Sequence, residues 1–529
     1  MGSHDVIESM MEDTMLKISA PESHPIRAPL ASGRKETGRR RRIWPLLALG
    51  LAAGNARAVP GDQLWRFYAD FGVTVVEPIA DLSGNGGKDV LVGSEDDSLY
   101  LVEGKGPKAG NQLWAVKFLS TLSAAVSVSD LDGDGKPDAV GGDQQGVIKA
   151  VSGASGALLW GYLTDTPGTI LSLAALPDVD NDGVPDVAAG SENDTVFCLS
   201  GKPGSKLGKV VWQFGVPAGK IHGPPGGVGN PAGKTSAVSA KDAPPSGANG
   251  LALLSQKNGA FGLAVGTNTD TVFCLALAGG TVKWKSGLPG DVWKVAAFPD
   301  QDGDGIEEVL AACGADMAYL LKGSTGEVIW SHAVSMGATA LAVSDDMDGD
   351  GKPDALIGDG GGQVHCVPGK AQGANVPASW TYNFGDTSTI LSIAPMGDVD
   401  KDGRADCAVG TSSDVAALIS GKGTKSWSLN MGGEVTAVAD IGDVDGNGTF
   451  DMAAGTTMGF VSALYGGGPA SVMLHAPAGS APGRTRLGWN AAASRMEIRT
   501  GGKADEYDTG GRRLMRHTHL PAGQRATSK

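Results

Sequence analysis

Seven short acidic loops carry the residues of this sequence that could do chemistry. Each loop follows the pattern D-x-[DSN]-x-[DN]-G-x-x-[DE], which places side-chain oxygens at positions 1, 3, 5 and 9. Calcium takes about six to eight oxygen ligands in proteins, and alternate residues of a tight loop can direct their side chains at one centre. Glycine at position 6 permits the sharp turn that such a loop needs. The predicted calcium ligands are Asp81, Ser83, Asn85 and Asp89; Asp130, Asp132, Asp134 and Asp138; Asp178, Asp180, Asp182 and Asp186; Asp300, Asp302, Asp304 and Glu308; Asp346, Asp348, Asp350 and Asp354; Asp398, Asp400, Asp402 and Asp406; and Asp443, Asp445, Asn447 and Asp451.

An ordinary Asp/Gly turn is the competing interpretation of any single loop. Seven copies at a regular spacing disfavour it, because four carboxylates within a few Å repel one another strongly unless a cation neutralises them. The loop at 81–89 has only two carboxylates among its ligands and should bind calcium most weakly, and the loop at 443–451 should be intermediate. A helical EF-hand loop ends with Glu at position 12. Here the last ligand comes at position 9 and strand-forming residues follow, so we expect β-hairpins.

The spacing of the loops indicates a repeat protein. The loops begin 45 to 52 residues apart, except for one gap of 122 residues. Within that gap, Val265–Cys274 closely matches Ala188–Cys198 of the preceding unit, although it has no acidic loop. Residues 251–284 therefore supply an eighth unit without a calcium site.

Each unit has the pattern of four strands. An apolar run precedes the loop, two strands follow it, and a fourth strand ends in tryptophan. The last unit lacks its tryptophan, whereas Trp65 stands before the first unit, so the N-terminal strand should complete the last blade and close the ring. The sequence thus predicts an all-β fold, an eight-bladed β-propeller over residues 59–467, with seven blades as the alternative. The repeated tryptophans, expected to pack between blades, are Trp114, Trp160, Trp212, Trp284, Trp330, Trp380 and Trp427.

Composition and charge narrow the functional classes. The 82 glycines and 5% aromatic residues suit a turn-rich β protein. Residues 59–483 hold 24 Lys and Arg against 48 Asp and Glu. The loop positions themselves provide 25 of these carboxylates. Such an acidic body makes nucleic acid an unsuitable partner.

The N-terminal region, residues 1–58, has the features of a secretory signal peptide. A basic run at Arg39–Arg42 precedes an apolar stretch at Ile43–Leu51, and a small-residue site at Ala56–Ala58 predicts cleavage before Val59. The apolar stretch is short for a membrane span. An N-terminal anchor is the alternative. We expect a mature chain without a transmembrane span that is secreted, periplasmic or at the cell surface.

Two further segments lie outside the predicted ring. Residues 215–249 are rich in Pro, Gly, Ser and Lys and should form an insertion between the third and fourth blades. Residues 468–529 form a basic C-terminal tail. The five cysteines leave at least one unpaired, and those at 198, 274 and 366 recur at one repeat position, so we expect small buried apolar residues rather than disulfides.

The loop and its following strand resemble a known repeat. Asp178–Gly190 is similar to the FG-GAP repeat, also described as the VCBS-type repeat, of integrin alpha-subunit propellers and bacterial surface proteins. The Gly and Trp strand ends also resemble quinoprotein (PQQ-type) repeats. The first resemblance implies a calcium-stabilised propeller used in adhesion or recognition, with an extracellular protein or glycan as ligand. In the tail, Glu506–Leu514 and Leu520–Gly523 resemble the end of an immunoglobulin-like sorting domain; a simple disordered tail is the alternative.

Two other functional classes are weighed against a binding module. A secreted enzyme on a propeller scaffold, resembling a polysaccharide lyase or a quinoprotein, is the first, but no catalytic residue is assigned. The sequence has no Cys-Cys pair, no His-x-x-x-His pair and no Gly-x-Ser-x-Gly elbow, and His365 beside Cys366 fits a packed strand residue. An envelope assembly scaffold that acts through exposed strand edges is the second.

Overall fold

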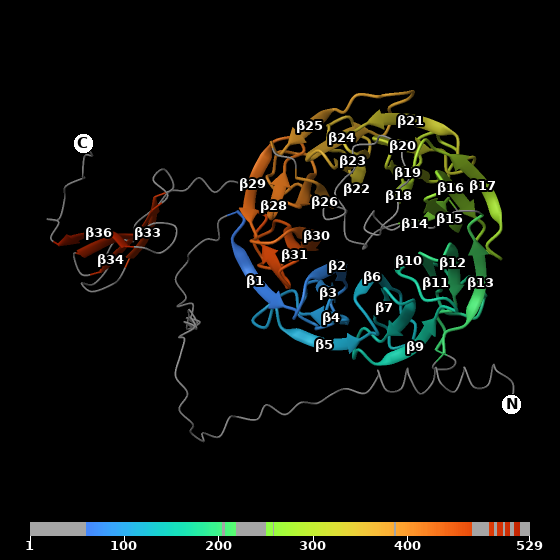
Figure 1. Cartoon of the computed structure of the whole chain (residues 1–529), viewed down its shortest axis with the longest axis horizontal. Coiled ribbons are helices and arrows are strands. Elements are labelled where there is room, and N and C mark those ends of the chain that lie inside the picture. Colours follow the sequence, from blue (N-terminus) through green and yellow to red (C-terminus); the bar gives the residue numbers. More distant parts are fainter. Residues whose placement is uncertain are drawn as a thin grey trace, which may run out of the picture. The chain divides into compact units, whose positions relative to one another are not determined.

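The fold is an eight-bladed β-propeller, in which four-stranded antiparallel sheets surround a central axis (Figure 1). The computed structural model describes residues 60–203, 207–217, 250–257, 259–385 and 388–467, and the backbone of four strands near the C-terminus. The chain divides into two compact units, Met1–Pro469 and Ala470–Lys529. The expected all-β class and eight blades are confirmed, and the seven-bladed alternative is wrong.

Each blade is a meander that runs from an inner strand beside the axis to an outer strand at the rim. Blades 1 to 4 consist of β2 (Val73–Ile79), β3 (Asp89–Ser94), β4 (Ser98–Val102) and β5 (Gln112–Lys117); β6 (Leu122–Val128), β7 (Asp138–Asp143), β8 (Val147–Val151) and β9 (Leu158–Leu163); β10 (Ile170–Ala175), β11 (Val187–Ser191), β12 (Thr195–Leu199) and β13 (Val210–Gly215); and β14 (Leu251–Gln256), β15 (Gly259–Thr267), β16 (Thr271–Leu275) and β17 (Val282–Gly287). Blades 5 to 8 consist of β18 (Val292–Phe298), β19 (Glu308–Cys313), β20 (Met317–Leu321) and β21 (Val328–Ala333); β22 (Ala338–Ser344), β23 (Asp354–Asp359), β24 (Gln363–Pro368) and β25 (Trp380–Asn383); β26 (Ile390–Met396), β27 (Asp406–Thr411), β28 (Val415–Ile419) and β29 (Lys425–Asn430); and β30 (Val435–Gly442), β31 (Asp451–Thr456), β32 (Phe460–Leu464) and β1 (Gln63–Tyr68).

The ring is closed by a strand from the start of the propeller. β1 pairs antiparallel with β32, with Trp65 opposite Ala463 and Phe67 opposite Val461. It takes the outer position of blade 8 beside strands that come from the end of the propeller (Figure 1). The closing strand is therefore as predicted. Blade 4, which was expected from sequence similarity alone, is also present as a complete sheet.

Hydroxyl side chains connect the inner strands of neighbouring blades. In most inner strands the register shifts after the first residue, which leaves one residue outside the regular pairing. Where that residue is Ser or Thr, its hydroxyl donates to a carbonyl at the start of the next inner strand. These bonds are Thr74 to Leu122 at 2.6 Å, Ser123 to Ile170 at 2.7 Å, Thr339 to Ile390 at 2.7 Å and Thr436 to Val73 at 2.7 Å.

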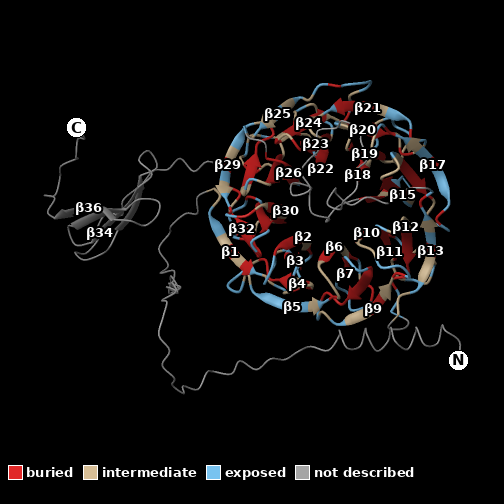
Figure 2. Ribbon diagram, viewed as in Figure 1, coloured by how far each residue is buried: buried red, intermediate tan, exposed pale blue. Residues whose placement is uncertain are grey.

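The hydrophobic core is divided among the junctions between blades. Eight clusters of buried apolar residues each combine side chains of two neighbouring blades, so the clusters run in a closed circuit. Figure 2 shows the burial in the inner and middle strands and the exposure along the outer strands. All five cysteines are buried and free, which agrees with their expected packing role.

The repeated tryptophans join each outer strand to the next blade. Trp160 is fully buried, and its Nε1 donates to the Gly201 carbonyl at 3.0 Å. Equivalent bonds run from Trp65 to Gly104, Trp114 to Gly153, Trp212 to Leu277, Trp284 to Gly323 and Trp427 to Gly466. One sequence expectation is wrong: the outer strand does not end at tryptophan. In β5, Trp114 is followed by three more strand residues, because the sheet continues across the rim.

A glycine turn covers the tryptophan of the preceding blade. Gly326 lies in the turn before β21 with a φ of 76°. A Cβ atom at this position would lie 2.5 Å from Cε3 of Trp284, closer than real side chains approach. Glycine is therefore required both by the backbone conformation and by the close approach to the ring.

A matched pair of substitutions should reveal the contribution of the tryptophan hydrogen bond. Trp160 and Trp330 are both fully buried, but Trp330 Nε1 has no hydrogen-bond partner among the described residues. Trp160→Phe leaves the Gly201 carbonyl without its donor, which costs about 1 to 2 kcal/mol. We expect Trp160→Phe to destabilise the propeller by this amount more than Trp330→Phe does, as measured by chemical denaturation. Equal losses would show that ring volume alone matters.

The predicted segments at the chain ends and in the insertion fall largely outside the described residues. This applies to the signal peptide within residues 1–58 and to residues 218–249 of the insertion, which both stay predictions. In the second unit, β33 (Arg486–Asn490), β34 (Arg495–Thr500), β35 (Lys503–Tyr507) and β36 (Arg513–Thr518) form one antiparallel sheet. The sorting-domain interpretation of this tail also stays a prediction. Within the described parts of the chain, no helix is long and apolar enough to cross a membrane.

Candidate metal centres

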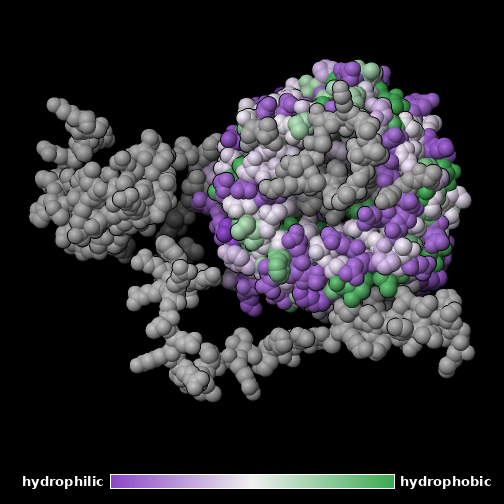
Figure 3. All heavy atoms as spheres, viewed as in Figure 1, coloured by the Kyte–Doolittle hydropathy of each residue, from purple (hydrophilic) through white to green (hydrophobic). Residues whose placement is uncertain are grey.

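The seven acidic loops connect the inner strand of a blade to its second strand. They therefore share one face of the propeller, and each begins where an inner strand leaves the central axis. Blade 4 is the exception, because β14 ends at Gln256 and β15 begins at Gly259, which leaves no room for a loop. Hydrophilic side chains are spread around the face of the ring seen in Figure 3.

The carboxylate at position 1 accepts hydrogen bonds from several backbone N–H groups of its own loop. In blade 2, Asp130 Oδ1 accepts from the backbone N–H of Gly133 at 2.6 Å, and its Oδ2 accepts from that of Gly135 at 2.8 Å. Both glycines have a φ of 83°, which is a conformation that favours glycine. The Gly135 N–H, with the other backbone donors of the loop, lowers the pKa of Asp130 below its usual value, so this side chain is anionic at neutral pH.

The carboxylate at position 9 anchors the loop to the junction between blades. Asp138 is fully buried; its Oδ2 accepts from Leu131 N at 2.7 Å and its Oδ1 from Gly153 N at 2.8 Å. The carbonyl of Gly153 in turn accepts from Trp114 Nε1 of blade 1 at 2.8 Å. Burial raises the pKa of Asp138, while these N–H donors act in the opposite direction. The ninth residue thus connects a loop, its own blade and the preceding blade.

The loops bring three carboxylates close enough to share one cation. In four loops these are the residues at positions 1, 3 and 9, with one oxygen from each within 4.8 Å of the others: Asp130, Asp132 and Asp138; Asp178, Asp180 and Asp186; Asp346, Asp348 and Asp354; Asp398, Asp400 and Asp406. In blade 5 the close group is instead Asp300, Asp302 and Asp304, at positions 1, 3 and 5. The residue at position 5 therefore belongs to the close carboxylate group in blade 5 but not in blades 2, 3, 6 and 7, whereas the sequence pattern predicts it as a ligand in all of them.

Two buried oxygens test whether a cation fits. Asp180 Oδ1 in blade 3 and Asp354 Oδ1 in blade 6 are buried and have no hydrogen-bond partner among the described residues. A buried carboxylate oxygen without a partner is unfavourable, and burial together with the neighbouring Asp348 and Asp350 raises the pKa of Asp354 to about 6. Calcium prefers carboxylate oxygens. The donor set of these loops therefore fits a calcium ion.

Lysines approach several loops from the connection between the third and fourth strands of the same blade. Lys209 Nζ lies 2.8 Å from Asp180 Oδ2, and Lys422 Nζ lies 3.1 Å from Asp402 Oδ2. Both lysine side chains are well exposed, so each pair contributes little to stability. They offset part of the negative charge of the loop without blocking the other carboxylate oxygens.

In the loop of blade 1, the neutral side chains at positions 3 and 5 form hydrogen bonds. Ser83 Oγ donates to Asp89 Oδ1 at 3.1 Å, and Asn85 Nδ2 donates to the Lys105 carbonyl at 2.7 Å. Asp81 is the only exposed carboxylate among the four predicted ligands of this loop. The ranking of blade 1 as the weakest calcium site stays a prediction. In blade 8, Asn447 Oδ1 accepts from Thr449 N at 2.6 Å, the role that Asp134 Oδ1 plays toward Lys136 N in blade 2.

Comparison with known proteins identifies the repeat. The FG-GAP-like repeat family matches residues 81–141 and 346–409, which begin at the acidic loops of blades 1 and 6. The propeller carries FG-GAP-like repeats. No curated protein matches its sequence significantly.

Solved structures resemble this FG-GAP-type propeller in fold. The computationally designed Ika8 protein shares 14% identity at a TM-score of 0.52, over 77% of this chain and 100% of that chain. BamB from Moraxella catarrhalis shares 16% identity at a TM-score of 0.50, over 77% and 99%. Chaetomium thermophilum Sqt1, solved with the N-terminus of the ribosomal protein L10, shares 13% identity at a TM-score of 0.56, over 77% and 100%. At such identities the likeness shows the fold alone.

The histidine considered in the sequence is part of a buried polar chain. His365 Nε2 lies 3.2 Å from Asp359 Oδ2, and its Nδ1 lies 3.3 Å from His332 Nε2. His332 Nδ1 lies 2.8 Å from the Val376 carbonyl. Both imidazoles are buried, and burial lowers the pKa of His332. This arrangement agrees with the packing role expected for His365.

Sequence reasoning missed the charged residues of the central channel. Glu77 and Lys294 stand inside otherwise apolar inner strands, VTVVEPI and VWKVAAF. The signal in the sequence is a charged residue in an inner strand, at a position where the inner strands of most other blades carry Ala or Val. The sequence alone does not identify the site, because only the closed ring shows that these positions face a common cavity.

Proposed function

We propose that the FG-GAP-type propeller binds calcium ions in its acidic loops and acts as a secreted or cell-surface binding module. The observation that carries the calcium proposal is the repeated convergence of three carboxylates, in loops whose backbone is already folded around position 1. The calcium ion would supply charge neutralisation and connect the loop ends. The role of the protein residues is to hold these oxygens in place.

The proposal for each loop rests on its donor set. Blades 2, 3, 5, 6 and 7 offer four carboxylates each, blade 8 offers three and blade 1 offers two. Extracellular calcium modules commonly have dissociation constants of about 10⁻⁴ to 10⁻³ M. We therefore expect about six ions per chain at millimolar calcium, with the blade 1 site filled last.

Counting the bound ions tests the calcium proposal. Equilibrium dialysis against calcium, followed by elemental analysis, should give this stoichiometry for the full chain. Asp398→Asn removes the position 1 carboxylate of blade 7 and should abolish one equivalent. Asp414→Asn is the matched control, because Asp414 lies in the hairpin between the second and third strands of the same blade with a φ of 64°, which Asn also tolerates. A chain that binds no calcium, or loses an equal share in both variants, would contradict the proposal.

We also propose that the protein works outside the cytoplasm and recognises an extracellular protein or glycan. FG-GAP repeats are typical of extracellular proteins, and the net acidic body is unsuited to nucleic acid. Propellers serve many functions, so the fold supports a binding role without defining the ligand.

Localisation and binding can be tested separately. The mature protein should be recovered from the periplasm, cell surface or medium with Val59 as its first residue, as read by N-terminal sequencing. Binding to arrays of extracellular glycans and proteins should depend on calcium. A full-length chain retained in the cytoplasm would contradict the localisation, and binding that is unchanged in EGTA would contradict a role of the loops in recognition.

A further inference from the structure

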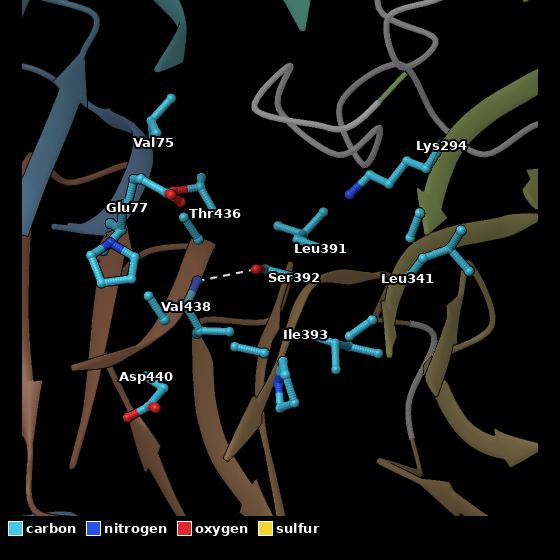
Figure 4. A pocket seen from close by; sticks show the side chains of 18 of the residues that line it. Val75, Glu77, Lys294, Leu341, Leu391, Ser392, Ile393, Thr436, Val438 and Asp440 are labelled. Atoms are coloured by element: carbon cyan, nitrogen blue, oxygen red, sulfur yellow. Dashed lines mark hydrogen bonds between the residues drawn. The ribbon is translucent and has the colours of Figure 1, made fainter. Parts of the chain in front are cut away.

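The centre of the propeller contains a cavity with its own chemistry. Its volume is about 540 Å³, which is within the range of small-molecule sites. It is lined by the inner strands β2, β6, β18, β22, β26 and β30. Most lining side chains are Val, Leu, Ile, Ala or Pro. Figure 4 shows these inner-strand side chains converging on a common space.

Lys294 brings an unpaired positive charge into this cavity. Its side chain extends from β18 into the cavity, and its ammonium group points toward the side on which Leu391 lies (Figure 4). Among the described residues, no carboxylate forms an ion pair with Lys294, and no hydrogen bond of its Nζ is present. Burial lowers the pKa of Lys294 to about 8. A partly desolvated cation without a partner is unfavourable, and an anionic ligand would relieve it.

The remaining charges of the cavity lie away from Lys294. Lys88 Nζ and Asp440 Oδ2 are 3.4 Å apart and balance each other. Glu77 projects from β2, four blades away around the ring of eight, so it faces Lys294 across the axis (Figure 4). Burial raises the pKa of Glu77 to about 7, while Lys88 acts in the opposite direction. Near neutral pH its carboxyl group can therefore be protonated and can donate a hydrogen bond.

We propose that this cavity binds a small organic carboxylate with an apolar body. The ligand carboxylate pairs with Lys294, and its body lies against Leu341, Leu391 and Ile393. A hydroxyl or carbonyl group at its far end reaches the wall that carries Glu77. This site is separate from the acidic loops, and it does not depend on the calcium or localisation proposals.

Binding of 4-hydroxybenzoate to the calcium-loaded full chain tests the proposal. Isothermal titration should detect binding at millimolar concentration at pH 6.5, whereas the neutral isostere 4-hydroxybenzamide should bind at least tenfold more weakly. Lys294→Met keeps the length of the side chain without its charge and should weaken 4-hydroxybenzoate at least tenfold. Lys425→Met on the exposed outer strand β29 is the matched control and should leave the affinity unchanged.

The pH dependence of binding provides an independent readout. Above pH 7, ionised Glu77 repels a carboxylate, so affinity should fall between pH 6.5 and pH 8. Glu77→Gln cannot ionise and should keep most of its affinity over that interval. Absence of 4-hydroxybenzoate binding, equal binding of the amide, or unchanged affinity in Lys294→Met would overturn the proposal.

The unliganded protein shows whether Lys294→Met is folded and informative. The folded pKa of Lys294 lies below its unfolded value near 10.5, so the folded state loses stability as pH falls from about 10.5 to about 8, and the loss is complete below that. The other titratable groups that line the cavity are Glu77, Lys88 and Asp440. Lys294→Met should therefore raise the melting temperature at pH 7 and lose this advantage above about pH 10.5. A lower melting temperature at pH 7 would show that Lys294 already has a counter-charge, which contradicts the proposal.

Discussion

Chelation of calcium with EGTA should lower the thermal unfolding midpoint of the propeller by about 10 °C. A ligand that binds only the folded state adds RT ln(1 + [L]/Kd), which is about 1.4 kcal/mol per site at ten times Kd. The six loops with at least three carboxylates would together add about 8 kcal/mol. For a propeller of this size we expect roughly 1 to 2 °C per kcal/mol. Differential scanning calorimetry with calcium and with EGTA measures the effect.

Add-back experiments separate specific calcium binding from simple screening of charge. Calcium should restore the midpoint at millimolar concentration, whereas an equal ionic strength of sodium chloride should restore only a small part of it. Magnesium should be less effective, because it demands a smaller octahedral site and loses its water reluctantly. The same midpoint in calcium and in EGTA would show that the loops are ordinary turns.

Asp138→Ala should destabilise the propeller even in EGTA. The substitution leaves the buried N–H groups of Leu131 and Gly153 without acceptors, and each such group costs about 1 to 3 kcal/mol. Loss of a partly desolvated carboxylate offsets some of this, so we expect a net loss of about 3 kcal/mol. Asp132→Ala removes an exposed acceptor and should change stability in EGTA by about 0.5 kcal/mol or less. Urea denaturation of both variants measures the difference.

Calcium should leave the stability difference between the two variants of blade 2 unchanged. Each removes one ligand of the same site, so each should forgo the calcium contribution of that loop, about 1.4 kcal/mol at ten times Kd. The difference between Asp138→Ala and Asp132→Ala should thus be the same with and without calcium. If Asp138→Ala matched Asp132→Ala in EGTA, its carboxylate would serve only as a metal ligand and not as an anchor of the loop.

The repeat architecture could be predicted from sequence because each unit carries the same short sequence pattern. Each loop, strand and tryptophan recurs at a fixed spacing, and the missing loop of blade 4 was bridged by the likeness of Val265–Cys274 to Ala188–Cys198. The last unit lacks a tryptophan, and an extra one, Trp65, precedes the first unit. This single displaced residue was enough to predict that β1 completes blade 8.

Other features depend on how distant blades meet. The hydrogen bonds between Asp138 and Gly153 and between Gly153 and Trp114 join β7, the β8–β9 connection and β5 of the preceding blade, so no local sequence pattern predicts them. Glu77 and Lys294 face each other because eight blades complete one turn, and seven blades would have placed them differently. The outer strands continue past tryptophan because their length is set by pairing with the third strand and not by the position of the indole side chain.

The seam in blade 8 has a kinetic consequence during synthesis. Arg66 Nε donates to Ser462 Oγ at 2.9 Å, a contact between residues 396 positions apart. At a translation rate of about 5 to 20 residues per second, β1 waits roughly 20 to 80 s before its partner strand exists. During this interval the first seven blades can form only an open arc, in which the apolar faces of blades 1 and 7 that pack against blade 8 stay exposed. The ribosome-bound chain is therefore most exposed to aggregation and to chaperones just before its last blade is made.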